Sequence, residues 1–232
     1  MGLCYSVPDR EAYKGTRDKE NRMHGSGTLD DGKGNVYEGS FDSGNKHGFG
    51  TMHWKAGHYY KGAWNQNRRH GEGMFFSATT GACYEGTCVE NEAHGRGIMT
   101  YGNGDIYTGQ WQHDMRCGPG KLVIKESGSI YEGNFSQDKQ DGFGKFISGT
   151  SSDQYIGFWV ADCMEGMGKY IYRNGTVYEG EFKANMKHGK GQTIGFNGTL
   201  YKGEYYEDAM HGAGEFLWAD GTSYEGTWHY NK

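Results

Sequence analysis

The chain has 232 residues and a formal net charge of −5, from 24 basic and 29 acidic residues. Its 42 glycines are accompanied by only 2 prolines, which excludes a collagen-like fibre, and the 15% aromatic content is too high for a disordered chain. Because no basic residues cluster, the charge balance also argues against nucleic-acid binding, which needs a basic face to neutralise phosphates.

The first residues predict a lipid-anchored leader, residues 1–12. The sequence MGLCYS at residues 1–6 fits the pattern Met-Gly-x-x-x-Ser/Thr, which is typical of N-myristoylation on Gly2. One myristoyl chain binds a membrane only marginally, with a constant of roughly 10⁴ per molar, so we expect Cys4 to supply a second, palmitoyl anchor. The first twenty-five residues lack the apolar core of a secretory signal.

A repeat begins at residue 13 and continues to residue 232. Tyr-x-Gly recurs at intervals of 23 or 24 residues, at Tyr13, Tyr37, Tyr60, Tyr84, Tyr107, Tyr131, Tyr155, Tyr178, Tyr201 and Tyr224. A Gly-x-Gly pair lies between consecutive copies, and the one-residue insertions from the second copy onward all follow that pair. This spacing predicts an array of ten repeats, the last of them partial. Each repeat would be a strand pair of fixed length followed by a turn that tolerates a one-residue insertion.

Each repeat predicts two short strands, and so an all-β fold. Alternation along a strand places Tyr37, Gly39 and Phe41 on one face, and it places the even-numbered residues of 48–54 on one face of the next strand. We expect the first glycine of Gly-x-Gly to adopt positive φ at the turn and the second to receive a ring from a neighbouring strand. Two-residue hairpin turns are predicted at Asn103-Gly104, Asn174-Gly175, Asn197-Gly198 and Asp220-Gly221.

The pattern Tyr-Glu-Gly-x-Phe/Trp followed by His-Gly-x-Gly resembles the MORN repeat across residues 13–232. This resemblance implies an elongated, twisted, single-layer antiparallel sheet of tandem hairpins, without enzymatic activity, in cytoskeletal and membrane-associated scaffolds. The chain departs from the pattern at Arg17 and Cys88, which replace a ring, and at Cys117, Asp141 and Glu165, which replace the histidine. The final strand is an edge, so we expect a homodimer through residues 201–232.

The ring that follows each Tyr-x-Gly is the candidate partner-binding residue. One interpretation is packing alone, with rings holding successive hairpins together. The other is a concave aromatic groove for a partner, because a single-layer sheet leaves apolar surface exposed and repeat arrays bind along such faces. The residues predicted to bind a helix or extended peptide are Phe41, Trp64, Trp111, Phe135, Trp159, Phe182, Tyr205 and Trp228.

Metal, cofactor and catalytic sites are not expected. Six repeats carry a histidine before the first glycine, at His24, His47, His70, His94, His188 and His211. Equivalent residues lie two strands apart, about 10 Å, whereas zinc ligands lie ~2 Å from the metal, so loop-stabilising hydrogen bonds are the better explanation. The sequence has no P-loop string, and no arrangement of nucleophile, base and orienting group stands out from the repeats.

These observations favour a non-enzymatic scaffold or adaptor that links a membrane to cytoskeletal or signalling partners. The partner would be a helix or extended peptide of a cytoskeletal, motor or membrane-associated protein. Five cysteines without a secretory signal favour the reducing cytoplasm, so we expect membrane-associated or cytoskeletal localisation, in a cilium or at the cell cortex. One alternative is a structural subunit of the ciliary axoneme, of radial spoke head type, without a lipid anchor. Another is direct phospholipid binding, which the balanced charge disfavours.

Overall fold

The computed structural model describes residues 12–232, which form nineteen β-strands and no helix. The predicted acylation sites Gly2 and Cys4 lie outside the described residues. The chain divides into two compact units, which we call the N-terminal unit, described from residue 12 to 114, and the C-terminal unit, residues 115–232.

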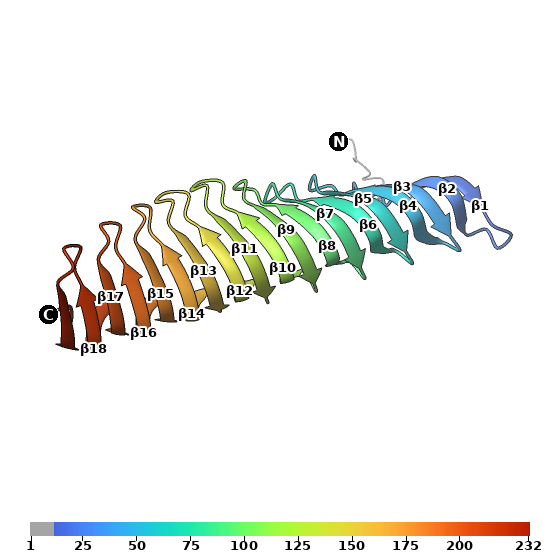
Figure 1. The fold of residues 1–232 in the computed structure, drawn as a ribbon. Helices are drawn as coiled ribbons and strands as arrows, with labels where there is room; N and C mark the ends of the chain where they lie inside the picture. The colour runs from blue at the N-terminus through green and yellow to red at the C-terminus, as the bar shows by residue number, and fades with distance from the viewer. Residues whose placement is uncertain (1–11) are drawn as a thin grey trace, which may run out of the picture. The chain divides into compact units, whose positions relative to one another are not determined.

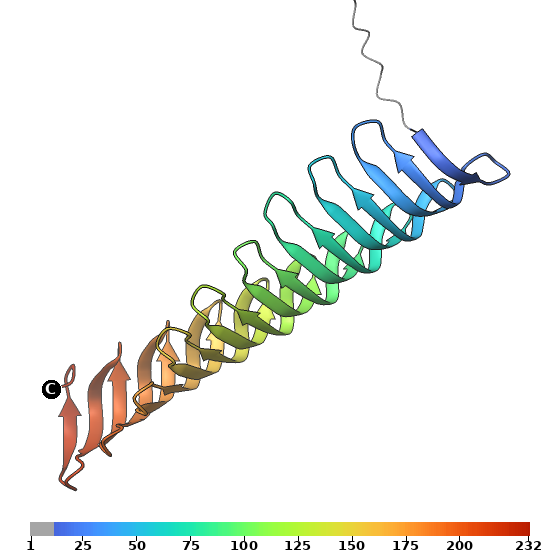
Figure 2. The ribbon, with the colours of Figure 1, turned by 90° about the horizontal axis from the view of Figure 1, so that it is seen from above.

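Within each unit, consecutive strands pair antiparallel in a single layer (Figure 1; Figure 2). The predicted all-β fold of tandem hairpins in a single-layer antiparallel sheet is therefore confirmed in both units. The strands of the N-terminal unit are β1 (Ala12–Arg17), β2 (Met23–Asp30), β3 (Val36–Asp42), β4 (Asn45–His53), β5 (Tyr59–Asn65), β6 (Arg68–Phe76), β7 (Cys83–Val89), β8 (Glu92–Thr100) and β9 (Ile106–Gln112). Those of the C-terminal unit are β10 (Met115–Val123), β11 (Ile130–Ser136), β12 (Lys139–Ile147), β13 (Gln154–Val160), β14 (Cys163–Ile171), β15 (Val177–Lys183), β16 (Met186–Ile194), β17 (Leu200–Tyr206), β18 (Ala209–Leu217) and β19 (Ser223–Trp228).

From the second repeat onward, the turn between the two strands of a hairpin has two residues, which explains why this part of the repeat has a constant length; in the first repeat, residues 18–22 separate β1 from β2. In the turn between β5 and β6, Gln66 and Asn67 have φ of 45° and 66°, the left-handed conformations of a type I′ turn. The side chain of Asn67 also accepts a hydrogen bond from the backbone N–H of Lys46, at 2.8 Å, in the preceding repeat. Asp138 does the same for Arg116, at 2.9 Å, so this position joins each hairpin to its predecessor.

The prediction of two-residue turns at the Asn-Gly and Asp-Gly dipeptides is wrong. The dipeptide Asn103-Gly104 lies in a five-residue loop, residues 101–105, between β8 and β9. The N–H of Tyr101 donates to the carbonyl of Asp105, and Gly104 has φ of 86°, so glycine supplies the left-handed residue of a longer loop. Where the repeat has its extra residue, the corresponding loop has six residues, 77–82.

Tyrosine rings lying over bare glycines form the core of each unit. Tyr60 is fully buried, and a Cβ atom on Gly73 of the paired strand would lie 2.2 Å from its hydroxyl oxygen. Tyr131 covers Gly144 of the C-terminal unit in the same way, with 2.4 Å between the two atoms. The first glycine of the pair, Gly71, has φ of 76°, so both predicted glycine roles are confirmed.

The tyrosine hydroxyl has its own structural role beside a β-bulge. The pairing of β5 with β6 shifts register between Gly62 and Trp64, so Ala63 is left without a regular partner. The hydroxyl of Tyr60 donates to the carbonyl of Ala63 at 3.0 Å, and that of Tyr131 donates to the carbonyl of Asn134 at 2.9 Å. The hydroxyl thus satisfies a carbonyl that the bulge removes from the ladder, which a phenylalanine could not do.

Candidate binding surfaces

The eight rings predicted to bind a partner lie in the packed ladder beside the tyrosines. Trp64 packs edge-to-face against Tyr60, with ring centroids 5.2 Å apart, and against Tyr37 of the preceding repeat at 5.4 Å. Seven of the eight rings are only 3% to 6% exposed, and Trp228 is half-buried. These side chains hold neighbouring repeats together, and their role in direct partner contact stays a prediction.

Cationic side chains cover part of this ring ladder. The Nζ atom of Lys46 lies 5.3 Å from the ring centroid of Tyr37 and 5.2 Å from that of Trp64. Lys187 lies 5.6 Å from the ring centroids of Tyr178 and Tyr205 in the C-terminal unit. Burial lowers the pKa of both lysines. In these repeats the outer surface above the rings is therefore cationic, and cation–π contact stabilises it.

The opposite side of the sheet lacks the ladder of tyrosines and their packed rings, and we call it the ring-free face for that reason. It carries the residues that alternate with the ladder along each strand. On the C-terminal unit it exposes Phe143 of β12 (52%), Phe158 of β13 (50%) and Met167 of β14 (59%). Phe143 and Phe158 pair directly across the two strands, with ring centroids 5.6 Å apart. We call these three side chains the apolar patch. Exposed apolar groups gathered on neighbouring strands are typical of an interaction surface.

A row of charged residues borders the apolar patch on the same face. Lys145 and Lys169 lie on either side of Ile156 in the strand register. The Nζ atom of Lys169 is 2.6 Å from Oε1 of Glu179, and Nε2 of Gln192 donates to the other oxygen of that carboxylate at 3.2 Å. The patch thus has cationic neighbours on two strands, and beyond them the row becomes mixed in charge.

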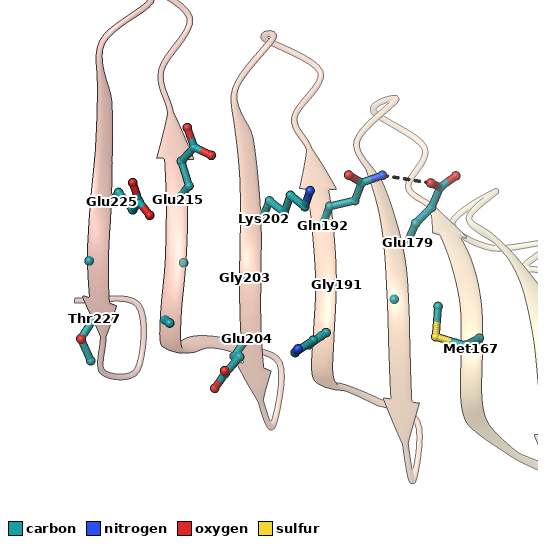
Figure 3. Close-up of a pocket in the computed structure, with 15 residues that line it drawn as sticks. Met167, Glu179, Gly191, Gln192, Lys202, Gly203, Glu204, Glu215, Glu225 and Thr227 are labelled. Carbon is teal, nitrogen blue, oxygen red and sulfur yellow. Dashed lines mark hydrogen bonds between the residues drawn. The ribbon is translucent and has the colours of Figure 1, made fainter.

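A groove of about 1070 Å³ continues along the ring-free face from Met167 towards β19 (Figure 3). Its floor is largely glycine backbone, because a Cβ atom on Gly191 or Gly203 would point to the tyrosine side of the sheet. Its charged and polar lining consists of Glu179, Lys190, Gln192, Lys202, Glu204, Glu215, Glu225 and Thr227. The groove therefore combines accessible backbone with side chains of both charges.

The histidines and cysteines form no metal centre in the part of the chain that the structure describes. In residues 12–232, no group of three or more His, Cys, Asp or Glu side chains could hold a metal ion. His24 lies 3.3 Å from the carboxylate of Asp42, but Nδ1 of His70 and of His211 is buried without a hydrogen-bond partner, so the predicted loop hydrogen bonds are not general. The four described cysteines, Cys83, Cys88, Cys117 and Cys163, are free thiols.

Across residues 12–232, no helix has the length and apolar character needed to cross a bilayer.

The family model described as MORN repeat matches nine segments, at residues 19–36, 37–59, 60–79, 84–106, 107–125, 131–152, 155–177, 178–200 and 201–223. No curated protein matches the sequence. Among solved structures, the TCP domain of SAS-4 from Drosophila melanogaster, in complex with a proline-rich motif of Ana2, is similar at 15% identity and a TM-score of 0.39, over 57% of this chain and 73% of that chain. A mutant TCP10 domain of CPAP from Danio rerio is similar at 11% identity and a TM-score of 0.30, over 84% and 96%. Likenesses at these TM-scores carry no argument about function.

Proposed function

The chain belongs to the MORN repeat family, and from this premise we propose that it is a non-enzymatic scaffold that links a membrane to cytoskeletal or signalling partners. The single observation that carries the proposal is the apolar patch of Phe143, Phe158 and Met167, half-exposed on neighbouring strands of the C-terminal unit. The rest of the binding surface is the groove that begins at Met167.

The apolar patch supplies binding free energy, and the groove supplies orientation. Fully burying a phenylalanine or methionine contributes about 1.5–3 kcal/mol, so covering three half-exposed side chains contributes roughly 3 kcal/mol in total. Side chains of both charges, such as Glu179, Lys190 and Lys202, favour a partner with complementary charges. An extended or helical segment of another protein, with two or three apolar anchors followed by polar residues, fits this arrangement.

Proximity labelling in the native cell tests the apolar patch. The variant carries Phe143→Ser, Phe158→Ser and Met167→Ser in the full chain. The matched control carries Phe49→Ser, which removes a side chain that is 71% exposed on the ring-free face of the N-terminal unit. We expect the triple variant to lose specific labelled neighbours that the control keeps. An identical set of neighbours for the two variants would contradict the proposed contact surface.

The membrane link depends on Gly2 and Cys4 and is a separate part of the proposal. Metabolic labelling with a myristate analogue should mark the wild-type chain and leave Gly2→Ala unlabelled, and a palmitate analogue should distinguish Cys4→Ser. An unlabelled wild-type chain that sediments with axonemes would favour the axonemal subunit instead. Flotation of the Gly2→Ala/Cys4→Ser variant with anionic liposomes would favour direct phospholipid binding.

Self-association is proposed at the last hairpin, residues 201–232. Strand β19 pairs with β18 along one edge, and an exposed strand edge can pair with a second copy. Light scattering of the full chain and of a chain ending at residue 200 should give a dimer and a monomer, respectively. An unchanged assembly state after truncation would remove this end as the dimer contact.

A further inference from the structure

A second pocket lies at the turns of the N-terminal unit, away from the surface assigned above. We call it the turn pocket. It encloses about 660 Å³ between the turn at residues 31–35, the turn at residues 54–58 and strand β6. Three cations and three rings dominate its lining, namely Lys33, Lys55, Arg69, Trp54, His58 and Phe75. Neither the family assignment nor the proposed scaffold contact accounts for this combination.

The floor of the turn pocket is aromatic. Trp54 packs edge-to-face against Phe75, with ring centroids 6.0 Å apart, and the imidazole of His58 stacks on Phe75 at 6.3 Å. Both Trp54 and Phe75 are partly exposed, so the rings present apolar surface to a ligand. An apolar side chain that covers them would be removed from water on the side that faces the rings.

Hydrogen bonds between successive turns fix this floor before any ligand arrives. The backbone N–H of Lys55 donates to the side-chain oxygen of Asn35 at 2.9 Å, which joins the two turns. The N–H of Ala78 donates to Nδ1 of His58 at 3.0 Å, which joins the second turn to the next one. Because the turns are already ordered, little conformational entropy is lost when a ligand binds.

The rim of the turn pocket is cationic, and no carboxylate belongs to its lining. Arg69 lies 4.9 Å from the ring centroid of Phe75 and donates to the carbonyl of Asn91. The neighbouring carboxylate of Asp31 accepts from the N–H of Lys33 at 2.8 Å and from the side-chain amide of Asn35 at 2.6 Å. These bonds hold Asp31 within its own turn and favour its charged form, but the three cations of the lining outnumber this one neighbouring carboxylate, so the rim favours an anionic ligand.

We propose that the turn pocket binds an acidic peptide segment, with one apolar side chain against Trp54 and Phe75 and flanking carboxylates at Lys33 and Lys55. The two lysines come from turns of adjacent repeats, whose backbones are about 10 Å apart at two strand spacings, and the side chain of Lys55 lies against Gly34 of the first turn. In an extended peptide this corresponds to carboxylates about three residues apart. The aromatic floor matches an apolar side chain flanked by carboxylates better than it matches inorganic phosphate, which has no apolar part.

Calorimetric titration of the full chain with a defined peptide tests this inference. The probe is Gly-Glu-Asp-Phe-Glu-Asp-Gly, and its neutral counterpart is Gly-Gln-Asn-Phe-Gln-Asn-Gly. A third peptide replaces the probe's phenylalanine with glycine. We expect the acidic probe to bind roughly tenfold or more tightly than either of the others, which corresponds to about 1.4 kcal/mol. Equal affinity for the acidic and neutral peptides would overturn the proposal.

Charge-reversal variants locate the binding site. Lys33→Glu/Lys55→Glu should weaken binding of the acidic probe by roughly tenfold or more, and Trp54→Ala should weaken it similarly by removing the floor. Lys61→Glu is the matched control, because Lys61 is an exposed lysine in the same unit but on the ring-free face. Both lysines of the test variant are exposed, so its fold should be retained, and Lys33→Gln/Lys55→Gln repeats the test without added charge.

Two further outcomes would overturn the proposal. Unchanged affinity in Lys33→Glu/Lys55→Glu would place the peptide elsewhere on the chain. Tighter binding of a nucleoside triphosphate than of the acidic probe, abolished by the same substitutions, would make the turn pocket a phosphate site and not a peptide site.

Discussion

The two units share one ring ladder but expose different surfaces. On the ring-free face, one bulge position of the N-terminal unit is Ala63, and one bulge position of the C-terminal unit is Phe158. Opposite these residues stand Phe49 and Phe143, so that Phe49 has no aromatic partner where Phe143 has one. The positions that build the sheet are therefore the same in both units, while the positions between the rings determine which surface can bind a partner.

The turns vary between individual repeats of both units. In the N-terminal unit, Trp54 and His58 lie in the turn of residues 54–58, against Phe75, and these rings form the floor of the turn pocket. At the position of Trp54, the C-terminal unit has Ile124, Ser148, Tyr172, Gly195 and Trp218. One repeating frame can therefore carry separate sites on different edges and faces.

Alkaline pH should give the largest effect, the unfolding of both units. Burial raises the pKa of Tyr37 in the N-terminal unit and of Tyr155 in the C-terminal unit from 10.0 to about 12. Since the raised pKa belongs to the folded state, the stability that neutral tyrosine contributes is fully present below about pH 10 and is lost as the pH rises towards 12. Loss of the circular dichroism signal should coincide with the last rise in tyrosinate absorbance, which comes from the buried rings. Complete ionisation of the tyrosines near pH 10 without loss of structure would contradict the buried ladder.

Replacing a ring-covered glycine should be the most destabilising single substitution. Gly73→Ala and Gly144→Ala each place a methyl group within 2.4 Å of a tyrosine hydroxyl that is already hydrogen-bonded. We expect a loss of about 3 kcal/mol or more in each unit, measured by urea unfolding, because the buried ring has no space to move. The control is Gly198→Ala, which meets nothing within 4 Å and incurs only the strain of its φ of 86°, about 1–2 kcal/mol. A loss no larger than that of the control would show that the ring contact is dispensable.

Removing the tyrosine hydroxyl should cost less than filling the glycine site. Tyr60→Phe and Tyr131→Phe leave the bulge carbonyls of Ala63 and Asn134 without their donor. An unsatisfied carbonyl of this kind costs about 1–3 kcal/mol. The same loss in urea unfolding of both variants would establish that the two units use the hydroxyl equivalently. An unchanged free energy of unfolding in one variant would mean that water replaces the hydroxyl donor in that unit.

The ring ladder could be predicted from the sequence because its signal is local and repeated ten times. The type I′ turns were missed although their signal was present, since Asn67 and Asp138 each stand seven residues after a Tyr-x-Gly tyrosine. Sequence alternation also placed Gly48 on the ring face. That placement is wrong, because at its φ of 65° an added Cβ atom would meet Ser40 of the opposite face at 3.3 Å. Alternation assumes regular pairing, and a bulge in every hairpin breaks that assumption.

The binding surfaces were less predictable than the frame. Burial of Trp64 depends on contact with Tyr37 of the preceding repeat, which a pattern inside one repeat does not contain. The turn pocket requires Lys33, Trp54 and Phe75 to meet from three separate segments. Consecutive members of this set are 21 residues apart, which differs from the repeat interval of 23 or 24, so the repeat pattern does not bring them together and only the stacking of turns reveals them.

The smallest expected effect concerns the charges of the ring-free face. Lys169 and Glu179 form an ion pair of 2.6 Å, but their side chains are 43% and 41% exposed. A double-mutant cycle with Lys169→Ala and Glu179→Ala should give a coupling free energy of about 0.2–1 kcal/mol in urea unfolding, and added salt should reduce it. A coupling above 2 kcal/mol would mean that this face helps to hold the sheet. A small coupling means that the Lys169–Glu179 ion pair contributes little to holding the sheet of the C-terminal unit together.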